Sequence, residues 1–378
     1  MKFSVEAKAL SAALAILKGA IAARSTMPVL ACARVEATRG TIIVTGSDMT
    51  NECSVKIPAE VDTHGITAIS AAVLSSIAKS AKSSTLTFDL GQDRLAKIGC
   101  GRSKYTIATV DPRDFPVMED QRGVTATMAA ADLLHLLAST RHAHSADPTR
   151  YYLNGVYLHV LGKHLVAAAT DGHRCVVDRI PVPAGFSAMP GVIVGSATVD
   201  LMRAVLATRD TVAVTINERT ASFVCDDTVV IARCVEGTFP DYARAIPGES
   251  TTILIRTEAE RILAGLSALS AIDDAGASFP IRIGPGNSET VGMMARRNTE
   301  GREARAEIEG EGSAAQSGVN ARYLKDALGI WPEGAFVSIQ QGSPGSPIRI
   351  VSDKKPDLVA VVMPMRAPDE AEVKEAAE

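Results

Sequence analysis

The chain has 378 residues, of which 46% are hydrophobic and 22% are charged, and its formal net charge is −4. This composition excludes an intrinsically disordered protein, and the length favours two or three domains over one core. A net charge of −4 argues against nucleic-acid binding, unless the basic residues gather on one face of the molecule.

Cysteine spacing and the N-terminus point to an intracellular protein. No CxxC pair occurs among the six cysteines, so neither a zinc site nor a disulfide framework is expected. The apolar run ALSAALAIL begins after Glu6 and Lys8 and ends at Lys18, which is unlike a signal peptide. No run of about 20 apolar residues is present to span a membrane. We therefore expect a cytoplasmic protein with no membrane association, no metal and no cofactor.

Helical periodicity recurs along the chain, and short β-rich runs such as TIIVTG, LTFDL, GVYLHV and VAVTIN lie between the helical segments. Six amphipathic helices are predicted, at 7–24, 70–83, 129–142, 196–209, 256–272 and 319–331. Their centres lie roughly 59 to 67 residues apart, and such a regular interval indicates a repeat architecture.

Two pairs of matching segments group these units two by two. SDMTNECSVKIP (47–58) and TDGHRCVVDRIP (170–181) each carry an Asp with a Pro ten residues later. TIATVDPRDFP (106–116) and VIARCVEGTFP (230–240) share Ile-Ala, a Val–acid pair and a final Phe-Pro. We predict an α+β fold of three similar domains, 1–122, 123–246 and 247–366, each with two units of a helix plus antiparallel strands. An acidic, flexible tail at 367–378 is expected to follow.

Charge is distributed unevenly between the predicted helices and the rest of the chain. The six helical segments contain 12 Lys/Arg and 5 Asp/Glu, a balance of +7, and the remaining 27 and 38 give −11. If all the helices face one side, that side attracts phosphate without regard to base sequence.

Several motifs, in their order and spacing, resemble the bacterial DNA polymerase III β subunits, or β sliding clamps. These motifs are RYYLNGVYLHV, ATDGHRCVV, GTFPDYARAIP, NARYLKDAL, SPIRI and VVMPMR, and the resemblance covers residues 1–366. It implies a DNA-clamp fold in which each chain forms half of a closed ring, with helices lining the hole. It also implies a non-catalytic homodimer that encircles duplex DNA and tethers the replicative polymerase.

The resemblance also implies a pocket for short linear peptides of the polymerase III catalytic subunit, the clamp loader, other polymerases and repair proteins. The pocket residues would be Leu153, Thr170, Gly172, His173, Arg174, Pro240, Arg244, Pro347, Val361, Met363, Pro364, Met365 and Arg366. Methionine suits a surface that accepts several partners, because its flexible thioether packs again at little cost. The three arginines are expected to hold the polar end of a peptide.

Two further surfaces follow from the resemblance. The DNA contacts would be Arg24, at the end of the first basic helix, with Arg150, Tyr151 and Tyr152. The dimer interface would pair a strand carrying Arg102, Lys104, Tyr105 and Ile107 with Leu269, Glu300 and Glu303 at the opposite end of the other chain. Pairing of the edge strands across two chains would remove both exposed edges.

Two other functions remain open from the residues alone. Asp171 and His173 would share a face if they lay on a strand, as an acid–base pair of a hydrolase requires. No G-x-S-x-G, Walker A or metal-spaced His/Cys set accompanies them, and the His142–His144 run reads as a capped or solvated helix end. The second alternative is a repeat scaffold that binds proteins but does not encircle DNA.

Overall fold

The computed structural model describes residues 1–22, 24–81, 84–119, 122–250, 252–272, 279–286, 290–297, 302–313 and 315–367. The chain has mixed α and β structure, with antiparallel pairing between its strands, and forms two compact units. Unit 1 contains Met1–His135 and Val182–Glu236, and unit 2 contains Leu136–Pro181 and Gly237–Glu378. The predicted central domain, 123–246, is therefore divided between the two units.

Unit 1 is built on a long antiparallel sheet in the order β8-β7-β6-β1-β4-β16-β15-β14-β9. A further strand, β3, pairs with both β4 and β2, and β2 also pairs with β5. The strands are β1 (Lys2–Glu6), β2 (Cys32–Thr38), β3 (Thr41–Ser47), β4 (Asn51–Thr63), β5 (Gly65–Ser70), β6 (Thr85–Leu90), β7 (Leu95–Cys100), β8 (Ser103–Ala108), β9 (Val124–Ala129), β13 (Val192–Gly195), β14 (Thr211–Ile216), β15 (Thr220–Cys225) and β16 (Thr228–Arg233).

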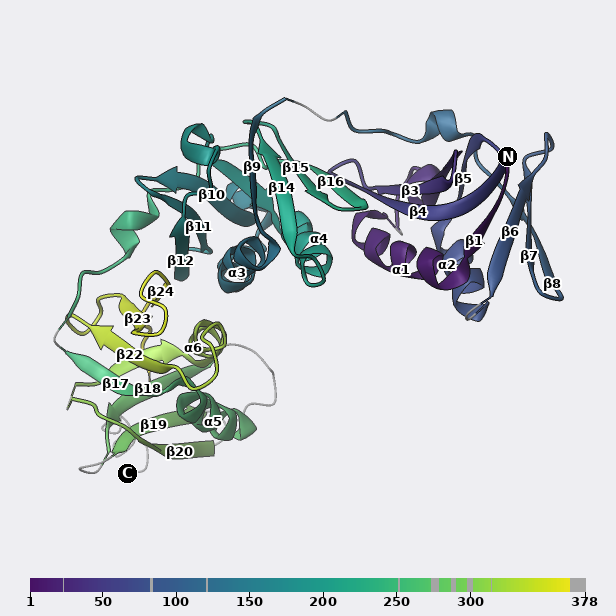
Figure 1. The fold of residues 1–378 in the computed structure, drawn as a ribbon. Helices are drawn as coiled ribbons and strands as arrows, with labels where there is room; N and C mark the ends of the chain where they lie inside the picture. The colour runs from purple at the N-terminus through teal and green to yellow at the C-terminus, as the bar shows by residue number, and fades with distance from the viewer. Residues whose placement is uncertain are drawn as a thin grey trace. The chain divides into compact units, whose positions relative to one another are not determined.

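The helices of unit 1 bury one apolar stripe each. α1 (Ala7–Leu17) buries Leu10, Leu14 and Leu17 at intervals of three and four residues, as an amphipathic helix on a sheet does. It packs beside α2 (Ala71–Ser80), whose first turn is capped by the Ser70 hydroxyl (Figure 1). α4 (Ser196–Leu206) also belongs to unit 1, and the division between the units falls within α3 (Ala130–Thr140).

Unit 2 contains two sheets, in the orders β10-β11-β12-β24-β23-β22-β17 and β20-β19-β18-β21. The helices α5 (Ala259–Leu269) and α6 (Ala321–Leu328) lie side by side, and α5 packs on β20 (Figure 1). The strands are β10 (Gly155–Leu161), β11 (His164–Thr170), β12 (Arg174–Pro181), β17 (Ile253–Glu258), β18 (Pro280–Pro285), β19 (Thr290–Arg297), β20 (Arg302–Glu309), β21 (Ser317–Asn320), β22 (Phe336–Gln341), β23 (Ile348–Ser352) and β24 (Val359–Val362).

All six predicted helices are present, but their C-terminal ends were predicted too late. α1 ends at Leu17 and continues only as a 3-10 turn, Lys18–Ala20, so Arg24 does not lie on a helix as predicted. Within their observed bounds the six helices carry six Lys/Arg and four Asp/Glu, a balance of +2. The predicted balance of +7 was too high, because several basic residues follow the helix ends instead of lying on the helices.

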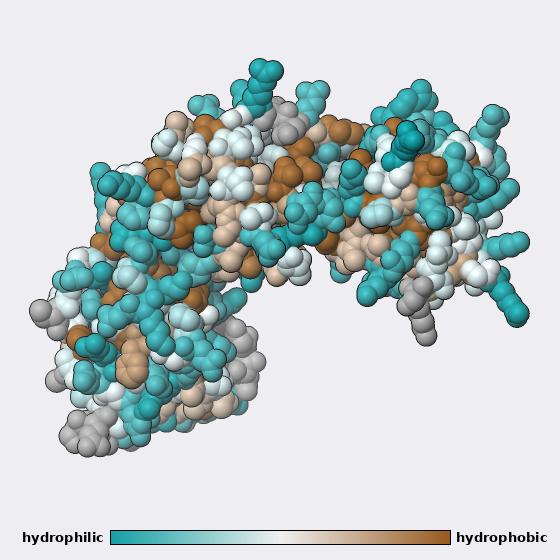
Figure 2. Space-filling view, in the orientation of Figure 1, coloured by the Kyte–Doolittle hydropathy of each residue, from teal (hydrophilic) through white to brown (hydrophobic). Residues whose placement is uncertain are grey.

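Hydrophilic side chains and small apolar patches alternate on the face of the molecule that Figure 2 shows. In the described part of the chain, no helix is both long enough and apolar enough to cross a membrane. The six cysteines are free, and no cluster of three or more His, Cys, Asp or Glu among the described residues could hold a metal ion.

Candidate functional site

The turn between β11 and β12 is the centre of the candidate site in unit 2. Asp171 accepts hydrogen bonds on Oδ1 from the backbone N–H groups of His173 and Arg174, at 2.8 and 3.0 Å. Gly172, which lies between Asp171 and His173, has a φ of 90°, a left-handed conformation that glycine adopts without strain. Asp171 and His173 therefore do not lie on a strand, and the acid–base pair of the hydrolase alternative was wrong. The carboxylate of Asp171 holds the turn.

Arg174 follows this turn and is the most heavily engaged side chain of the site. Its Nε lies 3.1 Å from Asp171 Oδ2, its Nη1 lies 2.6 Å from Asp326 Oδ2, and its guanidinium lies 4.5 Å from the centre of the Tyr323 ring. The side chain is only 10% exposed. Arg174 thus holds α6 against β12, and its guanidinium is not free to bind the polar end of a peptide as predicted.

The Met363-Pro364-Met365 segment closes the site directly after β24. The Met363 N–H donates to the carbonyl of His173 at 2.8 Å, and the Met365 N–H donates to the carbonyl of Gly318 at 2.9 Å. Pro364, which has no N–H to donate, stands between these two anchors. Both thioether side chains remain exposed, Met363 at 39% and Met365 at 37%, although β24 itself is buried. An apolar strand therefore ends in two adaptable apolar groups at the surface.

Aromatic residues of β10 pack against Phe239 and Tyr242, which are close in sequence to Pro240 and Arg244. The Tyr242 hydroxyl and His159 Nε2 are hydrogen-bonded at 2.9 Å, and the Tyr157 ring stacks between His159 and Phe239. Burial raises the pKa of Tyr242 to about 12, so its hydroxyl stays protonated. Arg244 is largely exposed and pairs with Asp241 at 2.9 Å.

The structure brings most of the predicted pocket residues onto adjoining elements of unit 2. Thr170, Gly172, His173 and Arg174 lie at the β11–β12 turn, and β12 pairs with β24, where Cys175 is opposite Val361. Pro347 directly precedes β23, which pairs with the other edge of β24. Leu153 and Val361 are buried, whereas Pro240, His173 and Arg366 are exposed.

Sequence reasoning missed two residues that hold this site together. Tyr323 and Asp326 come from α6, about 150 positions after Arg174, and the Tyr323 ring also stacks on His173. His142 was noted in the sequence but given another role, and its ring nitrogens are buried without hydrogen-bond partners. Burial and the nearby Arg174 lower the pKa of His142 to about 4. The prediction that His142 is solvated or caps the helix end was therefore wrong. The motif NARYLKDAL was the available signal for the α6 residues.

The predicted DNA-contacting residues lie apart from regular strands. Tyr151 and Tyr152 belong to a 3-10 segment, Pro148–Leu153, and not to a strand start, and their rings meet edge to face at 5.8 Å. Tyr151 is 53% exposed. Arg150 bonds Asp147, and its Nη1 donates to the carbonyl of Asp171 at 2.9 Å, so it also supports the central turn. Arg24 is exposed in a bend.

Two edge strands carry the predicted dimer residues. Strand β8, the edge of the unit 1 sheet, carries Lys104, Tyr105 and Ile107, with Arg102 in the turn before it. Strand β20, the edge of the smaller sheet in unit 2, carries Glu303. Leu269 is fully buried at the end of α5, so its side chain is not available to a second chain. Glu300 lies outside the described residues.

Known proteins with this arrangement are sliding clamps. The crystal structure of the Caulobacter crescentus beta sliding clamp matches with a TM-score of 0.91 and 28% identity, over 97% of this chain and 99% of that chain. A Pseudomonas aeruginosa sliding clamp (DNA polymerase III subunit beta) bound to griselimycin matches with a TM-score of 0.90 and 25% identity, over 97% and 99%. The fold is thus the DNA-clamp fold.

Sequence comparison identifies the branch of clamps. Family models of the DNA polymerase III beta subunit match residues 1–119 with the N-terminal domain and 127–241 with the central domain. The beta sliding clamp of Caulobacter vibrioides is 29% identical over 385 residues, which cover 97% of this chain and all of that protein. The chain belongs to the family of DNA polymerase III β subunits.

Proposed function

We propose that this chain is a DNA sliding clamp, a non-catalytic processivity subunit that closes as a homodimeric ring around duplex DNA. The observation that carries the proposal is the clamp fold over 97% of the chain, together with family membership. A topological link needs little direct affinity, which agrees with a net charge of −4. A replicating polymerase gains processivity because it is tethered to a ring that slides.

The proposed peptide pocket is the site around the β11–β12 turn and the Met363-Pro364-Met365 segment. Its apolar groups are exposed thioethers on a backbone that hydrogen bonds fix on both sides of Pro364. Such a surface receives different short peptides by small changes of methionine rotamer. The proposed occupants are linear segments of the polymerase III catalytic subunit, the clamp loader, other polymerases and repair proteins.

The proposed dimer interface joins β8 of one chain to β20 of the other as continuing antiparallel strands. Beside β8, a hollow of about 570 Å³ is lined mainly by apolar groups of α2 and β8, including Val73, Ile77 and Tyr105. Arg102 and Lys104 would face the acidic strand that carries Glu303, so attraction between the two ends would align the strands. Each chain offers both ends, and a two-fold axis closes the ring.

Three domains at 1–122, 123–246 and 247–366, with the tail at 367–378, remain our proposed division. The N-terminal family model ends at residue 119 and the central one begins at residue 127, on either side of the first boundary. The central model ends at residue 241, near the second boundary, and both observations support the division. Arg24, Arg150, Tyr151 and Tyr152 remain proposed contacts to the DNA backbone or to unpaired bases, and the exposed ring of Tyr151 supports that role. A cytoplasmic location follows from replication as the proposed task.

Processive synthesis tests the proposal. A polymerase III core and clamp loader from the same source should extend a primer on circular single-stranded DNA over thousands of nucleotides only when this protein is added. Products of equal length with and without the protein would contradict the proposal.

A further inference from the structure

The central turn of the proposed peptide pocket has a second copy in unit 1, between β3 and β4. Asp48 Oδ1 accepts hydrogen bonds from the N–H groups of Thr50 and Asn51 at 2.8 and 2.6 Å, as Asp171 does in unit 2. Met49 occupies the position of Gly172 and is left-handed too, with a φ of 72°. A non-glycine residue in this conformation is strained, and such strain occurs at functional sites as well as in ordinary turns.

The strand end that closes the pocket is also repeated. The Arg233 N–H donates to the carbonyl of Thr50 at 2.8 Å, as that of Met363 does to His173. Two residues on, the Val235 N–H donates to the carbonyl of Ile193 at 2.8 Å, as that of Met365 does to Gly318. The segment Arg233-Cys234-Val235-Glu236 thus stands where unit 2 has Met363-Pro364-Met365-Arg366.

A groove lies beside this second turn and strand end. It is a hollow of about 470 Å³ whose lining includes Met118, Arg219, Thr220, Arg233, Cys234 and Glu236. Thr220 pairs with Arg233 across β15 and β16, and Ile348, directly after Pro347, likewise pairs with Val362 across β23 and β24. The groove is therefore lined by the unit 1 counterparts of the strand ends at the proposed peptide pocket, while the turn at Asp48 holds one of these strand ends through the carbonyl of Thr50.

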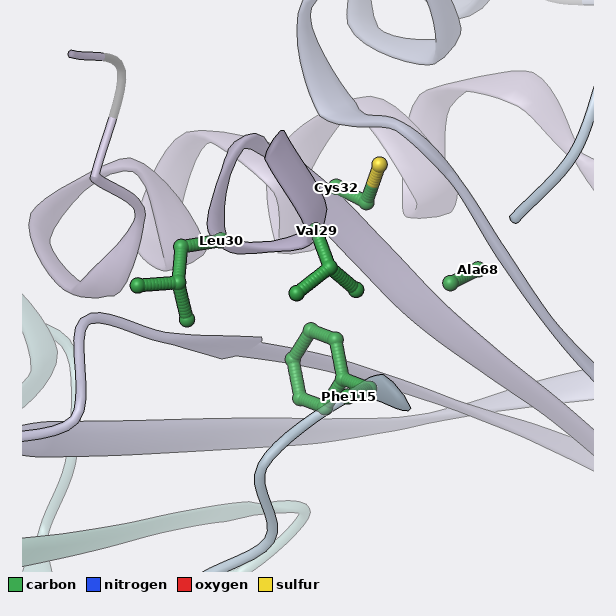
Figure 3. Packing of buried hydrophobic residues seen from close by; sticks show 5 residues of the cluster. All are labelled: Val29, Leu30, Cys32, Ala68 and Phe115. Atoms are coloured by element: carbon green, nitrogen blue, oxygen red, sulfur yellow. The ribbon is translucent and has the colours of Figure 1, made fainter. Parts of the chain in front are cut away.

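Fixed groups hold the linker that forms the wall of this groove. Phe115 packs under Val29 and Leu30, in an apolar cluster that also contains Cys32 and Ala68 (Figure 3). Three residues later, the N–H of Met118 donates to the carboxylate of Glu52 at 2.7 Å. Phe115-Pro116 here corresponds to Phe239-Pro240 beside the proposed pocket, as the two matching sequence segments predict. The linker is thus held at Phe115 by apolar packing and at Met118 by a hydrogen bond.

The chemistry of the groove differs from that of the proposed pocket. Arg219 and Arg233 are exposed, and neither guanidinium has an ion-pair partner within the described parts of the chain. Cys234 is half-buried, and burial raises the pKa of its thiol to about 12, so the thiol stays uncharged. Two cationic forks beside the apolar side chains of Val117 and Met118 fit a carboxylate side chain next to a small apolar one.

We propose that this groove is a second docking site, which receives an extended peptide segment of a partner protein that carries an acidic residue beside an apolar one. The inference rests on the proposed function, because it takes the pocket of unit 2 as a peptide site. The exposed acidic residues Glu119 and Glu236, beside the arginines, disfavour the continuous phosphates of a nucleic acid but leave room for a single carboxylate. The groove would give a partner that already occupies the methionine pocket a second point of attachment.

The experiment titrates the full-length protein with the peptide acetyl-Ala-Asp-Leu-Glu-Ala-amide and follows binding by calorimetry. The control peptide has Asn and Gln in place of Asp and Glu. The association constant of the control peptide should be at least fivefold lower than that of the acidic peptide. The double variant Arg219→Glu, Arg233→Glu should bind the acidic peptide with a similarly reduced association constant. The charge-preserving pair Arg219→Lys, Arg233→Lys should lose less. Hydrogen exchange should show protection of 117–119 and 219–236 on binding.

Three results with the peptide and the arginine variants would overturn the inference, and a fourth comes from the methionine variant described below. The three are no binding of the acidic peptide at millimolar concentration, unchanged binding by the double Glu variant, and displacement of the peptide by a short oligonucleotide that the same variant fails to bind. A further variant, Met363→Ala with Met365→Ala, separates the two sites. If this variant abolishes binding of the acidic peptide, the peptide occupies the methionine pocket and the inference fails. Normal binding of the acidic peptide to this variant, together with reduced processive synthesis, is the expected result. If processive synthesis is unchanged as well, the methionine segment is not the polymerase site, and the groove loses the parallel with the pocket on which it was inferred.

Discussion

The guanidinium of Arg174 lies 4.5 Å from the centre of the Tyr323 ring, and this contact joins β12 to α6 at the proposed peptide pocket. A lysine would keep the charge but lose the fork that reaches Asp171 and Asp326, and it would stack poorly. Arg174→Lys should therefore reduce the free energy of unfolding by about 1–2 kcal/mol and weaken binding of a polymerase-derived peptide. Chemical denaturation and fluorescence anisotropy measure the two effects.

Arg244→Lys is the matched control for that variant. Arg244 is 87% exposed, and its ion pair in the described part of the chain is with Asp241, three positions earlier. Its replacement should leave the free energy of unfolding within about 0.5 kcal/mol of the original. Equal losses of stability from the two variants would contradict the role given to Arg174.

Gly172→Ala should affect peptide binding as well as stability. At a φ of 90° any Cβ is strained, and here the new atom would lie 3.1 Å from Nη1 of Arg150. Gly345 has the same φ of 90°, but a Cβ there would meet nothing within 4 Å. Both alanine variants should lose about 1 kcal/mol of stability. Only Gly172→Ala should also weaken peptide binding. An equal loss of peptide affinity in Gly345→Ala would show that the β11–β12 turn has no special role.

Charge reversal on β8 tests the proposed ring closure. The double variant Arg102→Glu, Lys104→Glu should raise the dimer dissociation constant about tenfold while each chain stays folded, because exposed pairs contribute only about 0–1 kcal/mol each. Lys97→Glu, on the neighbouring strand β7, is the control and should leave the constant unchanged. Sedimentation velocity at nanomolar concentration measures the dissociation; an unaltered profile for the double variant would reject this interface.

His142 should make stability depend on pH in the acidic range. Its pKa is lowered from an ordinary value of 6.5 to about 4, so between these two values the unfolded chain binds more protons than the folded one. The free energy of unfolding that depends on neutral His142 is fully present above pH 6.5. It is lost as the pH falls towards 4, by up to about 3 kcal/mol. His142→Phe should flatten this slope, because the ring nitrogens have no hydrogen-bond partners to lose. Parallel slopes for the two proteins in urea titrations from pH 7 to 4 would refute the assignment.

Periodicity and repeat spacing predicted the six helices, the antiparallel strands and the fold class, because these depend on local apolar patterns. The same patterns could not predict that Asp171 bends the chain into a turn, since two hydrogen bonds to its carboxylate override the strand preference of the flanking residues. Nor could they reveal the contacts of Arg174 with Tyr323 and Asp326, which join residues about 150 positions apart. The burial of Leu269 likewise depends on packing that local spacing does not fix.

Retention on DNA of different topology tests the central claim, a closed ring around the duplex, most directly. The protein is loaded onto nicked circular DNA by a matching loader, and the bound fraction is then measured by gel filtration before and after a single cut by a restriction enzyme. A closed ring should stay on intact circles at moderate salt and leave within minutes once the DNA is linear, because it can slide off the ends. Equal loss from intact and linearised circles would show that the protein does not encircle the duplex.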